Sequence, residues 1–597
     1  MQEYTTPATL VIDESANLTD LVFRNADEAP DFACFARKKG DSWEDVSAVE
    51  FRDEVVALAK GLVAAGIEAG DRVAIMSKTR YEWSLADFAI WTAGAVPVPI
   101  YETSSAEQVE WILSDSGAVA AFVESEKHEN TVAEVRGNLP NLREVWRFET
   151  GVVGQLTEAG ADVDPAEIDR RRKTLGADSM ATLIYTSGTT GRPKGCELTH
   201  GNFLFDAQAV ADATAELWEQ GKSTLLFLPL AHVFARVIQI GCVFNRVQIG
   251  HSADIKNLLA DFAVFKPSFI LSVPRVFEKV YTTAKQKAHA DGKGRLFDRA
   301  EAVAVSYSQG LDKGGPSLLV KAEHALWDRL VYGKLRAALG GRVDYAVSGG
   351  APLGARLGHF FRGIGVTILE GYGLTETTAG ATLNRPDRMK VGTVGPPIPG
   401  VTVRIADDGE ILLKGGLIFR GYWHNEDASK EALEDGGWFH TGDIGELDTD
   451  GFLKITGRKK ELIVTAGGKN VAPAVLEERL QAHPLVSQAM VVGDNQPFIA
   501  ALITIDPEAF PGWKSSKGKP ADASVGDLAD DSDLVAEVQS AVDNANKAVS
   551  QAEAIRKFKI LAVDWTEDGG QLTPTLKLKR NVVAKECADD IEALYRK

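Results

Sequence analysis

The chain has 597 residues, of which 45% are hydrophobic, and this length exceeds what one hydrophobic core usually supports. Its formal net charge of −19 at pH 7 argues against general binding to nucleic acids or anionic membranes, because both attract basic surfaces. We therefore expect at least two domains, with local basic patches wherever an anionic ligand binds.

The cysteines and the apolar segments indicate a cytoplasmic protein. Cys34, Cys196, Cys242 and Cys587 show neither metal-ligand spacing nor pairing, which fits a reducing compartment. The first residues lack the basic and apolar regions of a secretory signal. The longest apolar run, residues 88–100, contains two prolines and is too short to span a bilayer.

From residue 71 the sequence alternates between short apolar runs and amphipathic stretches. RVAIM, VPVPIY and AVAAFVE are typical of strands, and YEWSLADFAIWTAG and SAEQVEWILSDSG are typical of helices between them. This βαβαβ order predicts an α/β fold with a parallel, doubly wound sheet.

A glycine-rich loop follows the next apolar run, residues 181–185. The stretch TSGTTGRPKG combines glycines, which let backbone N–H groups approach phosphate oxygens, with hydroxyls and one lysine. It is not a Walker loop, because Gly195 follows Lys194 and no Ser or Thr is placed to hold Mg²⁺. The candidate triphosphate-binding residues are Thr186, Ser187, Gly188, Thr189, Thr190, Gly191 and Lys194.

The rest of the chain shows three successive sequence patterns. Strands are expected at residues 223–228, 268–273 and 344–348, with helices over residues 280–339. Short strands after Gly392 predict a small β-subdomain. Residues 458–597 predict a separate α+β domain, with a helix at 472–482, strands at 488–493 and 498–505, an exposed loop at 514–529 and a helix around 533–553. The expected domains are therefore 1–457 and 458–597.

Five further motifs follow the loop in a fixed order. They are SGGAP at 348–352, GYGLTET at 371–377, WFHTGDIG at 438–445, GRKKELI at 457–463 and LTPTLKLKR at 572–580. In this order and spacing the set resembles the adenylate-forming superfamily of acyl-CoA synthetases, adenylation domains and luciferases. The string VPRVFEKVY at 273–281 and the block 437–477 look like bacterial long-chain fatty-acid CoA ligases.

The resemblance implies a reaction in two halves. A fatty-acid carboxylate attacks the α-phosphate of ATP to give acyl-AMP and pyrophosphate, and the thiol of CoA then displaces AMP. Because the first half brings two anions together, positive charge must lie between them, and Lys577 matches the family lysine for this role. By the same resemblance Thr375 touches phosphate, and Glu376 binds Mg²⁺, which prefers oxygen ligands.

The resemblance also implies the nucleotide contacts. Tyr372 would stack on adenine beside Gly373, Asp443 would accept hydrogen bonds from the ribose hydroxyls, and Arg458 would contact ribose and phosphate. The backbone of Gly349, Gly350 and Ala351 would line the adenine pocket.

Three expectations concern movement and the acyl group. Lys460 falls at the family's hinge position, about which the C-terminal domain would rotate to replace Lys577 by the loop containing Gly467 and Gly468 and so admit CoA. His232 matches a family residue at the acyl-binding wall, although a histidine between apolar segments is equally a core residue. The apolar stretch 233–244 would line an acyl tunnel or simply fill the core.

The leading interpretation is a long-chain fatty acid:CoA ligase that uses ATP and Mg²⁺. Alternatives are an acyl-AMP ligase that loads a carrier protein, a medium-chain or aryl-acid CoA ligase, and a noncatalytic lipid or nucleotide binder. The expected partners are the fatty acid, ATP and CoA and no nucleic acid. A weak peripheral membrane contact and the choice between monomer and homodimer stay open.

Overall fold

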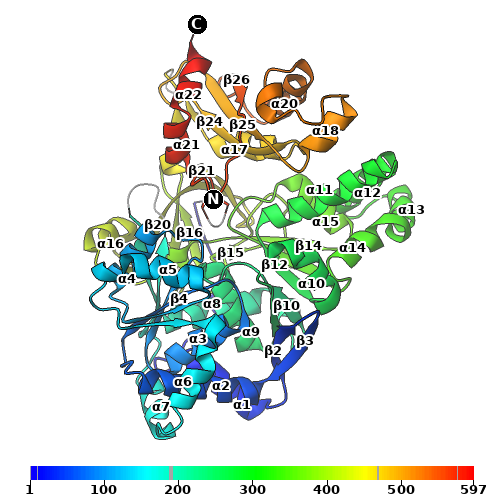
Figure 1. Cartoon of the computed structure of the whole chain (residues 1–597). Helices are drawn as coiled ribbons and strands as arrows, with labels where there is room; N and C mark the ends of the chain where they lie inside the picture. The colour runs from blue at the N-terminus through cyan, green and yellow to red at the C-terminus, as the bar shows by residue number, and fades with distance from the viewer. Residues whose placement is uncertain (1, 10, 187–191, 467–468, 574–575, 597) are drawn as a thin grey trace. The chain divides into compact units, whose positions relative to one another are not determined.

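The computed structural model describes residues 2–9, 11–186, 192–466, 469–573 and 576–596 (Figure 1). The chain forms two compact units. The first consists of Met1–Arg404, Leu412–Thr441 and Leu447–Leu453, and the second of Ile405–Ile411, Gly442–Glu446 and Lys454–Lys597. The expected fold class, α/β with sheets in a large N-terminal part and a smaller α+β C-terminal part, is confirmed.

The first unit contains a four-stranded parallel sheet in the order β5-β4-β6-β7. Its strands are β4 (Arg72–Met76), β5 (Val96–Ile100), β6 (Ala120–Val123) and β7 (Glu144–Arg147). Between them lie α3 (Tyr81–Thr92), α4 (Ala106–Ser116) and α5 (Glu126–Val135), so the predicted βαβαβ order is confirmed. Alternate residues of β4 face opposite sides and both sides are buried, as expected of a parallel sheet.

A second sheet of eight strands has the order β15-β14-β13-β12-β10-β11-β2-β3. Its parallel part contains the three predicted strands β10 (Ser223–Leu226), β12 (Phe269–Ser272) and β13 (Tyr345–Ser348), together with β2 (Ala33–Lys39), β11 (Gln248–His251) and β14 (Thr367–Tyr372). The antiparallel edges are β3 (Ser42–Ser47) and β15 (Thr382–Leu383).

A fully buried ion pair joins three elements of the first unit. Arg236 on α9 (Val233–Asn245) donates to both carboxylate oxygens of Asp87 on α3, at 2.5 and 3.2 Å. It also donates to the Thr182 hydroxyl at 2.6 Å. Because every charged group here is hydrogen-bonded, the pair fixes the register of α3 and α9 at a tolerable desolvation cost.

The strand predicted before the glycine-rich loop is β8 (Met180–Thr186), which pairs antiparallel with β9 (Lys194–Thr199). β18 (Gly421–Tyr422) pairs with the other edge of β9. Thr199 caps the following helix, α8 (His200–Ala213), through a capping box with Asn202. These four elements support the candidate site.

The predicted helical region is present as four helices and one π turn. They are α11 (Pro274–Ala290), α12 (Gly294–Leu311), α13 (Leu318–Trp327), η5 (Asp328–Tyr332) and α14 (Gly333–Ala338), and α15 (Ala355–Gly363) packs on α12. Other helices of this unit include α1 (Thr19–Glu28), α2 (Ala48–Ala64), α6 (Val152–Ala159), α7 (Pro165–Arg172), α10 (Leu258–Phe265) and α16 (Glu426–Ala432).

The short strands expected after Gly392 are β16 (Thr402–Ile405), β17 (Glu410–Lys414), β19 (Leu433–Glu434), β20 (Trp438–Leu447) and β21 (Leu453–Arg458). β1 (Glu3–Thr5) pairs with β16, and β19 pairs with β20.

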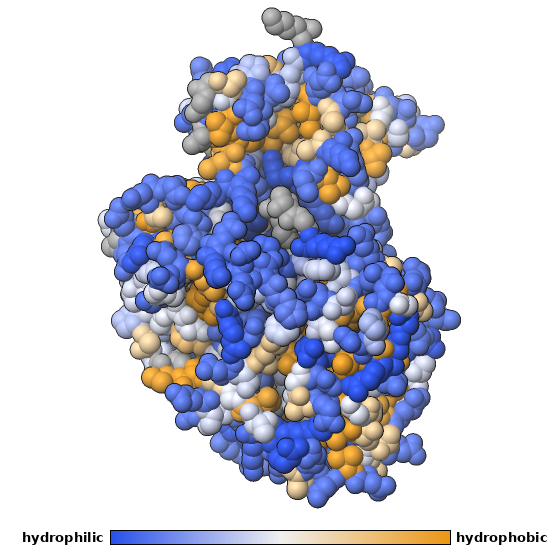
Figure 2. Space-filling model, turned by 90° about the vertical axis from the view of Figure 1, so that its left-hand side faces the viewer, coloured by the Kyte–Doolittle hydropathy of each residue, from blue (hydrophilic) through white to orange (hydrophobic). Residues whose placement is uncertain are grey.

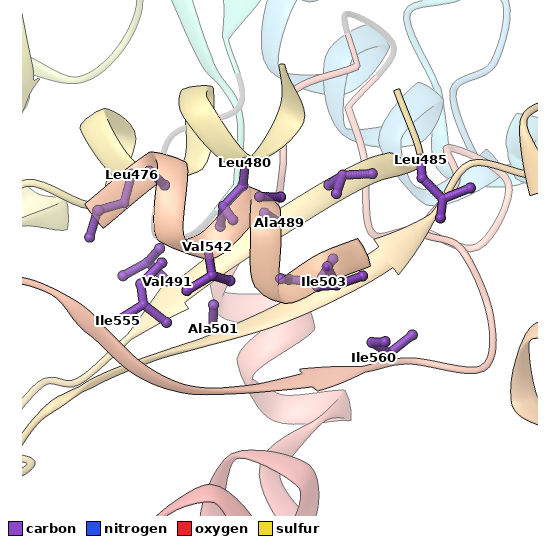
Figure 3. Close-up of a cluster of buried hydrophobic side chains, with 14 of the residues drawn as sticks. Leu476, Leu480, Leu485, Ala489, Val491, Ala501, Ile503, Val542, Ile555 and Ile560 are labelled. Carbon is purple, nitrogen blue, oxygen red and sulfur yellow. The ribbon is translucent and has the colours of Figure 1, made fainter. Parts of the chain in front are cut away.

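The second unit has its own core around β24 (Val486–Val492), β25 (Ile499–Ile505) and β26 (Ile555–Ile560). Alternate residues of β25 face two clusters: Ile499, Ala501 and Ile503 pack beneath α17 (Pro473–Gln481) and α20 (Ser532–Asn546) (Figure 3). Leu502 faces a second cluster with residues of α21 (Arg580–Glu586) and α22 (Ala588–Tyr595). This alternation of burial with a period of two residues explains why β24 and β25 could be predicted from the sequence.

Two expectations for the second unit were wrong in part. The helix expected around 533–553 ends at Asn546, because the Asn546 side chain bonds both the N–H and the carbonyl of Ile555 and turns the chain into β26. The loop expected at 514–529 includes the end of α18 (Phe510–Ser516) and α19 (Val525–Leu528). There Lys514 is buried and donates to the carbonyls of Ala521 and Ala523.

Hydrophilic residues predominate on the face in Figure 2, with smaller hydrophobic areas among them. Within the described ranges, none of the helices combines the length and the apolar content that crossing a bilayer requires.

Candidate active site

Two predicted side chains, Lys194 and Glu376, both contact Tyr422, close to where β9 and β18 pair. The Lys194 ammonium lies over the ring of Tyr422, 4.9 Å from its centroid. The Tyr422 hydroxyl donates a hydrogen bond of 2.8 Å to Oε1 of Glu376. The cluster therefore connects the phosphate-loop lysine to the predicted Mg²⁺ ligand through one tyrosine, which sequence reasoning missed.

Local backbone geometry fixes this cluster. Tyr422 pairs with Cys196 in the β9–β18 ladder, and Cys196 comes two residues after Lys194 in β9. Gly195 passes the ring of Tyr185 so closely that a Cβ there would lie 3.1 Å from the ring. Burial, and then the neighbouring Glu376 carboxylate, raises the pKa of Tyr422, so its hydroxyl stays protonated and donates.

The loop that carries Glu376 is wound tightly. A Cβ at Gly373 would lie 1.3 Å from the carbonyl oxygen of Ala379, so only glycine fits at this position. Thr378 and Ala379 both have positive φ, 50° and 87°, which non-glycine residues rarely adopt. Thr377 ties the turn together by accepting from the N–H of Leu374 at 2.8 Å.

Side chains of helix α8 bond this loop and also the segment 416–418. Gly380 donates its N–H to the buried carboxyl group of Asp206 at 3.0 Å. Asn202 donates to the carbonyls of Gly416 and Ile418, and Phe419 donates its N–H to the carbonyl of Glu376. The position of Glu376 is therefore set by strand pairing and by a helix that starts directly after β9.

The predicted adenine segment lies at the carboxyl ends of neighbouring parallel strands. Ser348 and Glu370 are paired in β13 and β14, so Gly349 and Tyr372 follow at the same edge. The N–H of Gly349 bonds the carbonyl of Ser272, and Gly350 has φ of +84°. Ligands of open parallel sheets bind at such an edge.

His232 begins helix α9 near this segment. Its Nδ1 accepts the N–H of Phe234 at 3.1 Å, which satisfies one of the unpaired donors of the first helical turn. A Cβ at Gly349 would lie 3.6 Å from the Phe234 ring, so α9 starts beside the predicted adenine segment. His232 thus has a structural function as an N-cap, and its role at the acyl wall stays a prediction.

The donor set fits a magnesium ion that takes most of its ligands from phosphates and water. The described residues contain no group of three or more His, Cys, Asp or Glu side chains arranged around a common point. Glu376 is half-buried, and Tyr422 occupies only one of its carboxylate oxygens. One carboxylate with a free oxygen is what a protein offers Mg²⁺ when substrate phosphates complete the shell.

The second unit holds two of the predicted nucleotide-binding residues, and they form an ion pair. Arg458 donates from Nε to Oδ1 of Asp443 at 3.0 Å. Beside it Lys459 pairs with Asp408 at 2.6 Å and with Glu410 at 2.9 Å, and Glu410 also accepts the N–H of Gly442. Asp443 is buried, and the N–H of the preceding residue, Gly442, is bonded to Glu410. Together with the bond from Arg458, this holds the Asp443 carboxylate in one orientation.

Lys577 lies on a short closed loop of the same unit. The Thr573 hydroxyl accepts the N–H of Lys577 at 3.0 Å, and the N–H of Thr573 donates to the carbonyl of Lys577 at 2.8 Å. Leu572, which is buried, and Leu578 form a β-bridge at the base of the loop. Lys577 is exposed, as is the predicted hinge residue Lys460 in η7 (Lys459–Glu461).

Several predicted residues lie outside the part of the chain that the structure describes. They are Ser187, Gly188, Thr189, Thr190 and Gly191 of the phosphate loop, and Gly467 and Gly468 of the loop predicted to admit CoA. Thr186 is described as the last residue of β8, opposite Lys194. Thr375 begins η6 (Thr375–Thr377), next to Glu376, and Ala351 follows Gly350 at the sheet edge.

Comparison with known proteins agrees with the geometry. Residues 22–423 match the family model of the AMP-binding enzymes, and residues 460–597 match the model of the AMP-binding enzyme C-terminal domain. The chain is 57% identical over 600 residues to the long-chain-fatty-acid–CoA ligase FadD15 of Mycobacterium tuberculosis, covering all of both chains. It is 31% identical to the long-chain-fatty-acid–CoA ligase ACSBG2 of Xenopus laevis, over 95% of this chain and 82% of the relative.

Solved structures share the fold at lower identity. The anthranilate CoA ligase AuaEII, solved with anthranoyl-AMP, superposes with a TM-score of 0.72 at 20% identity, covering 98% of this chain and 99% of the other. With five ordered motifs, two matching family models and a relative of 57% identity over its full length, the chain belongs to the AMP-binding enzyme family.

Proposed function

We propose that this chain is a long-chain fatty acid:CoA ligase, which forms acyl-AMP and pyrophosphate from a fatty acid and ATP and then transfers the acyl group to CoA. The carrying observation is the full-length identity of 57% to relatives named as long-chain-fatty-acid–CoA ligases. The geometry supports the same chemistry, because Tyr422 contacts both Glu376 and Lys194, the lysine near the end of the glycine-rich sequence.

In the first half-reaction the chain's residues manage negative charge. Lys194 would neutralise phosphate oxygens, and Glu376 would hold Mg²⁺, whose charge would balance that of the triphosphate. Tyr422 would hold the Glu376 carboxylate through its hydroxyl and the Lys194 ammonium over its ring before ATP arrives. A charged group that is already oriented needs no rearrangement when the transition state forms, which is the basis of electrostatic catalysis.

Lys577 would supply the remaining positive charge between the carboxylate and the α-phosphate. Its loop is closed by Thr573, and its long side chain is exposed, which suits a group that must reach a substrate outside its own unit. We further propose that the C-terminal part turns about Lys460 between the half-reactions, so that the loop of Gly467 and Gly468 replaces Lys577 and admits CoA. Lys460→Pro, which restricts the backbone at this position, would then slow thioester formation more than adenylation.

Product analysis tests the proposed function directly. Purified protein is incubated with ATP, Mg²⁺, CoA and a mixture of fatty acids from short to long chains, and the products are identified by mass spectrometry. The proposal predicts long-chain acyl-CoA together with AMP, and none from a Glu376→Ala variant. Acyl-AMP without acyl-CoA would favour loading of a carrier protein. Medium-chain or aryl thioesters would correct the substrate class, and absence of all products would favour a noncatalytic binder.

A further inference from the structure

Helix α13 and the π turn after it expose a row of leucines to solvent. The exposed fractions are 84% for Leu318, 72% for Leu319, 56% for Leu326 and 52% for Leu330. Positions 318, 322, 326 and 330 recur every four residues, and Ala322 is also exposed, so these side chains form one stripe along the helix. We call this stripe, with Leu319 beside it, the leucine face.

The opposite side of α13 anchors it to the first unit. His324 bonds the carbonyl of Gly363 at 2.6 Å and stacks on the ring of Tyr307, with 3.8 Å between the ring centres. Glu323 accepts two hydrogen bonds from Arg299 on α12, at 2.7 and 2.8 Å. The helix is therefore anchored by polar contacts on one side, while Leu318 and Leu319 on the other side are mostly exposed.

Four cations lie in the same stretch of the chain as the leucine face. Lys313, Lys321, Arg329 and Lys334 are exposed and form no ion pair or hydrogen bond through their side chains within the described ranges. The two acidic residues of the same segment are each paired with an arginine, Glu323 with Arg299 and Asp328 with Arg336, both at 2.7 Å. A protein of net charge −19 thus presents here a surface that is apolar and positive.

We propose that the leucine face and its four cations dock the protein on an anionic lipid bilayer. An amphipathic helix binds in the interfacial plane when apolar side chains enter the acyl boundary and lysine or arginine stems reach up to the headgroups. The positive charges attract anionic lipids over a distance of about a Debye length, roughly 8 to 10 Å at physiological salt. An interface with a second copy would not require four cations without acidic partners on the same patch.

The purpose of this docking rests on the proposed function, because a long-chain fatty acid partitions into bilayers and a ligase held there meets its substrate at higher concentration. The binding itself does not depend on that function. It concerns residues in and next to α13 and η5, and none of those assigned to nucleotide or metal binding.

Vesicle co-sedimentation without substrate tests the proposal. The probes are vesicles of phosphatidylcholine alone and vesicles with equal parts of phosphatidylcholine and phosphatidylglycerol, each at low and high salt. The variants are Leu319→Gln with Leu326→Gln, and Lys321→Gln with Arg329→Gln. The matched controls are Val563→Gln, an equally exposed apolar residue of the second unit, and Lys173→Gln, an exposed lysine outside α13.

The proposal predicts that the wild type and both controls bind the anionic vesicles, more weakly at high salt. Each lost cation is expected to lower the partition coefficient about fivefold, and the two lost leucines together about tenfold or more. Equal binding by the variants, or no wild-type binding to anionic vesicles, would overturn the proposal. So would a dimer in size-exclusion chromatography that only the leucine variant disperses, because a second copy would then cover the face.

Ligase activity on a short, water-soluble fatty acid separates this proposal from the proposed function. All four variants are expected to retain it, since none touches the candidate site. Loss of vesicle binding with retained activity supports docking, whereas a wild type that binds vesicles but makes no acyl-CoA would contradict the proposed function alone.

Discussion

The two places that would supply positive charge to the reaction are built on different principles. Lys194 stands at the start of a strand, with its ammonium over Tyr422, which in turn orients Glu376. Lys577 is exposed on a loop whose backbone is closed by Thr573 and whose base is anchored by buried Leu572. The first arrangement joins two charged groups through one aromatic ring, and the second ties the backbone of Lys577 to Thr573 and places its side chain at the surface.

This difference follows the separate needs of the two groups. Phosphates are present throughout the reaction, so the residues that hold them gain from being oriented in advance. A lysine needed in one half-reaction only must be able to leave, and a long side chain at the surface of its unit allows that without unfolding of the unit. Loss of Lys577 should therefore affect one step strongly, whereas loss of Tyr422 should weaken every step that needs Mg²⁺ and ATP.

The largest effect is expected for Lys577→Ala. Removing a charge that acts mainly in the transition state should lower the rate of acyl-AMP formation by about 10²- to 10³-fold, with little change in ATP affinity. The rate is measured as pyrophosphate release from ATP and fatty acid without CoA. Lys585→Ala, at an exposed lysine on neighbouring α21, serves as the control and should keep the wild-type rate.

A smaller effect is expected for Tyr422→Phe, which keeps the ring beneath Lys194 and removes only the hydroxyl bond to Glu376. Because a hydrogen bond to a charged group contributes about 1.5–3 kcal/mol, kcat/KM for ATP should fall roughly 10- to 100-fold. The Mg²⁺ concentration needed for half-maximal activity should rise.

Tyr185→Phe provides the matched control, because the hydroxyl of Tyr185 in β8 makes a similar 2.6 Å bond to Asp115 on α4. A merely structural contribution of Tyr422 would make both variants lose stability alike and leave the Mg²⁺ requirement unchanged. That outcome would remove Tyr422 from the positioning of the cluster.

The smallest effect concerns the pH dependence of the first unit's stability. Burial, and then nearby Arg236, lowers the pKa of His200, at the start of α8, to about 3. The unfolded imidazole has a pKa of about 6.5, so below that pH the unfolded chain binds a proton that the folded chain does not. The stabilisation is complete above about pH 6.5 and falls by about 1.4 kcal/mol per pH unit as the pH decreases toward 3.

His200→Asn keeps an acceptor for the N–H of Leu18, which bonds Nδ1 of His200 at 3.2 Å, and removes the titrating ring. The variant should be less stable at neutral pH but lose stability less steeply between pH 7 and 5.5. Denaturant unfolding at several pH values measures this slope. His251, whose pKa burial also lowers to about 3, should account for part of the slope that remains, and an unchanged slope in the variant would exclude His200 as its source.

Much of the fold was predictable because its signals are local. The strands and helices of residues 71–124 and the two long strands of the second unit follow apolar patterns that burial on one or both faces imposes. The end of α20 was not predictable in this way, since it depends on one side chain, Asn546, meeting a residue that starts the next strand.

The candidate site was predictable only where a motif carries it. Lys194, Glu376, Asp443 and Lys577 stand in ordered motifs. Tyr422 lies outside these motifs, and its hydrogen-bond partner, Glu376, is 46 residues away in the sequence. Its only sequence signal is the position of FRGYW shortly after a strand. Likewise, the periodicity of residues 280–339 predicted amphipathic helices but could not tell that the leucines of α13 face solvent.

The most direct test of this account measures the two half-reactions separately in the wild type and in Lys577→Ala. Acyl-AMP formation is followed without CoA, and thioester formation is followed from supplied acyl-AMP and CoA. We predict that the variant loses the first reaction and carries out the second at close to the wild-type rate. Equal loss of both reactions, or retention of both, would contradict the assignment of Lys577 to adenylation and with it the division of roles between the two sites.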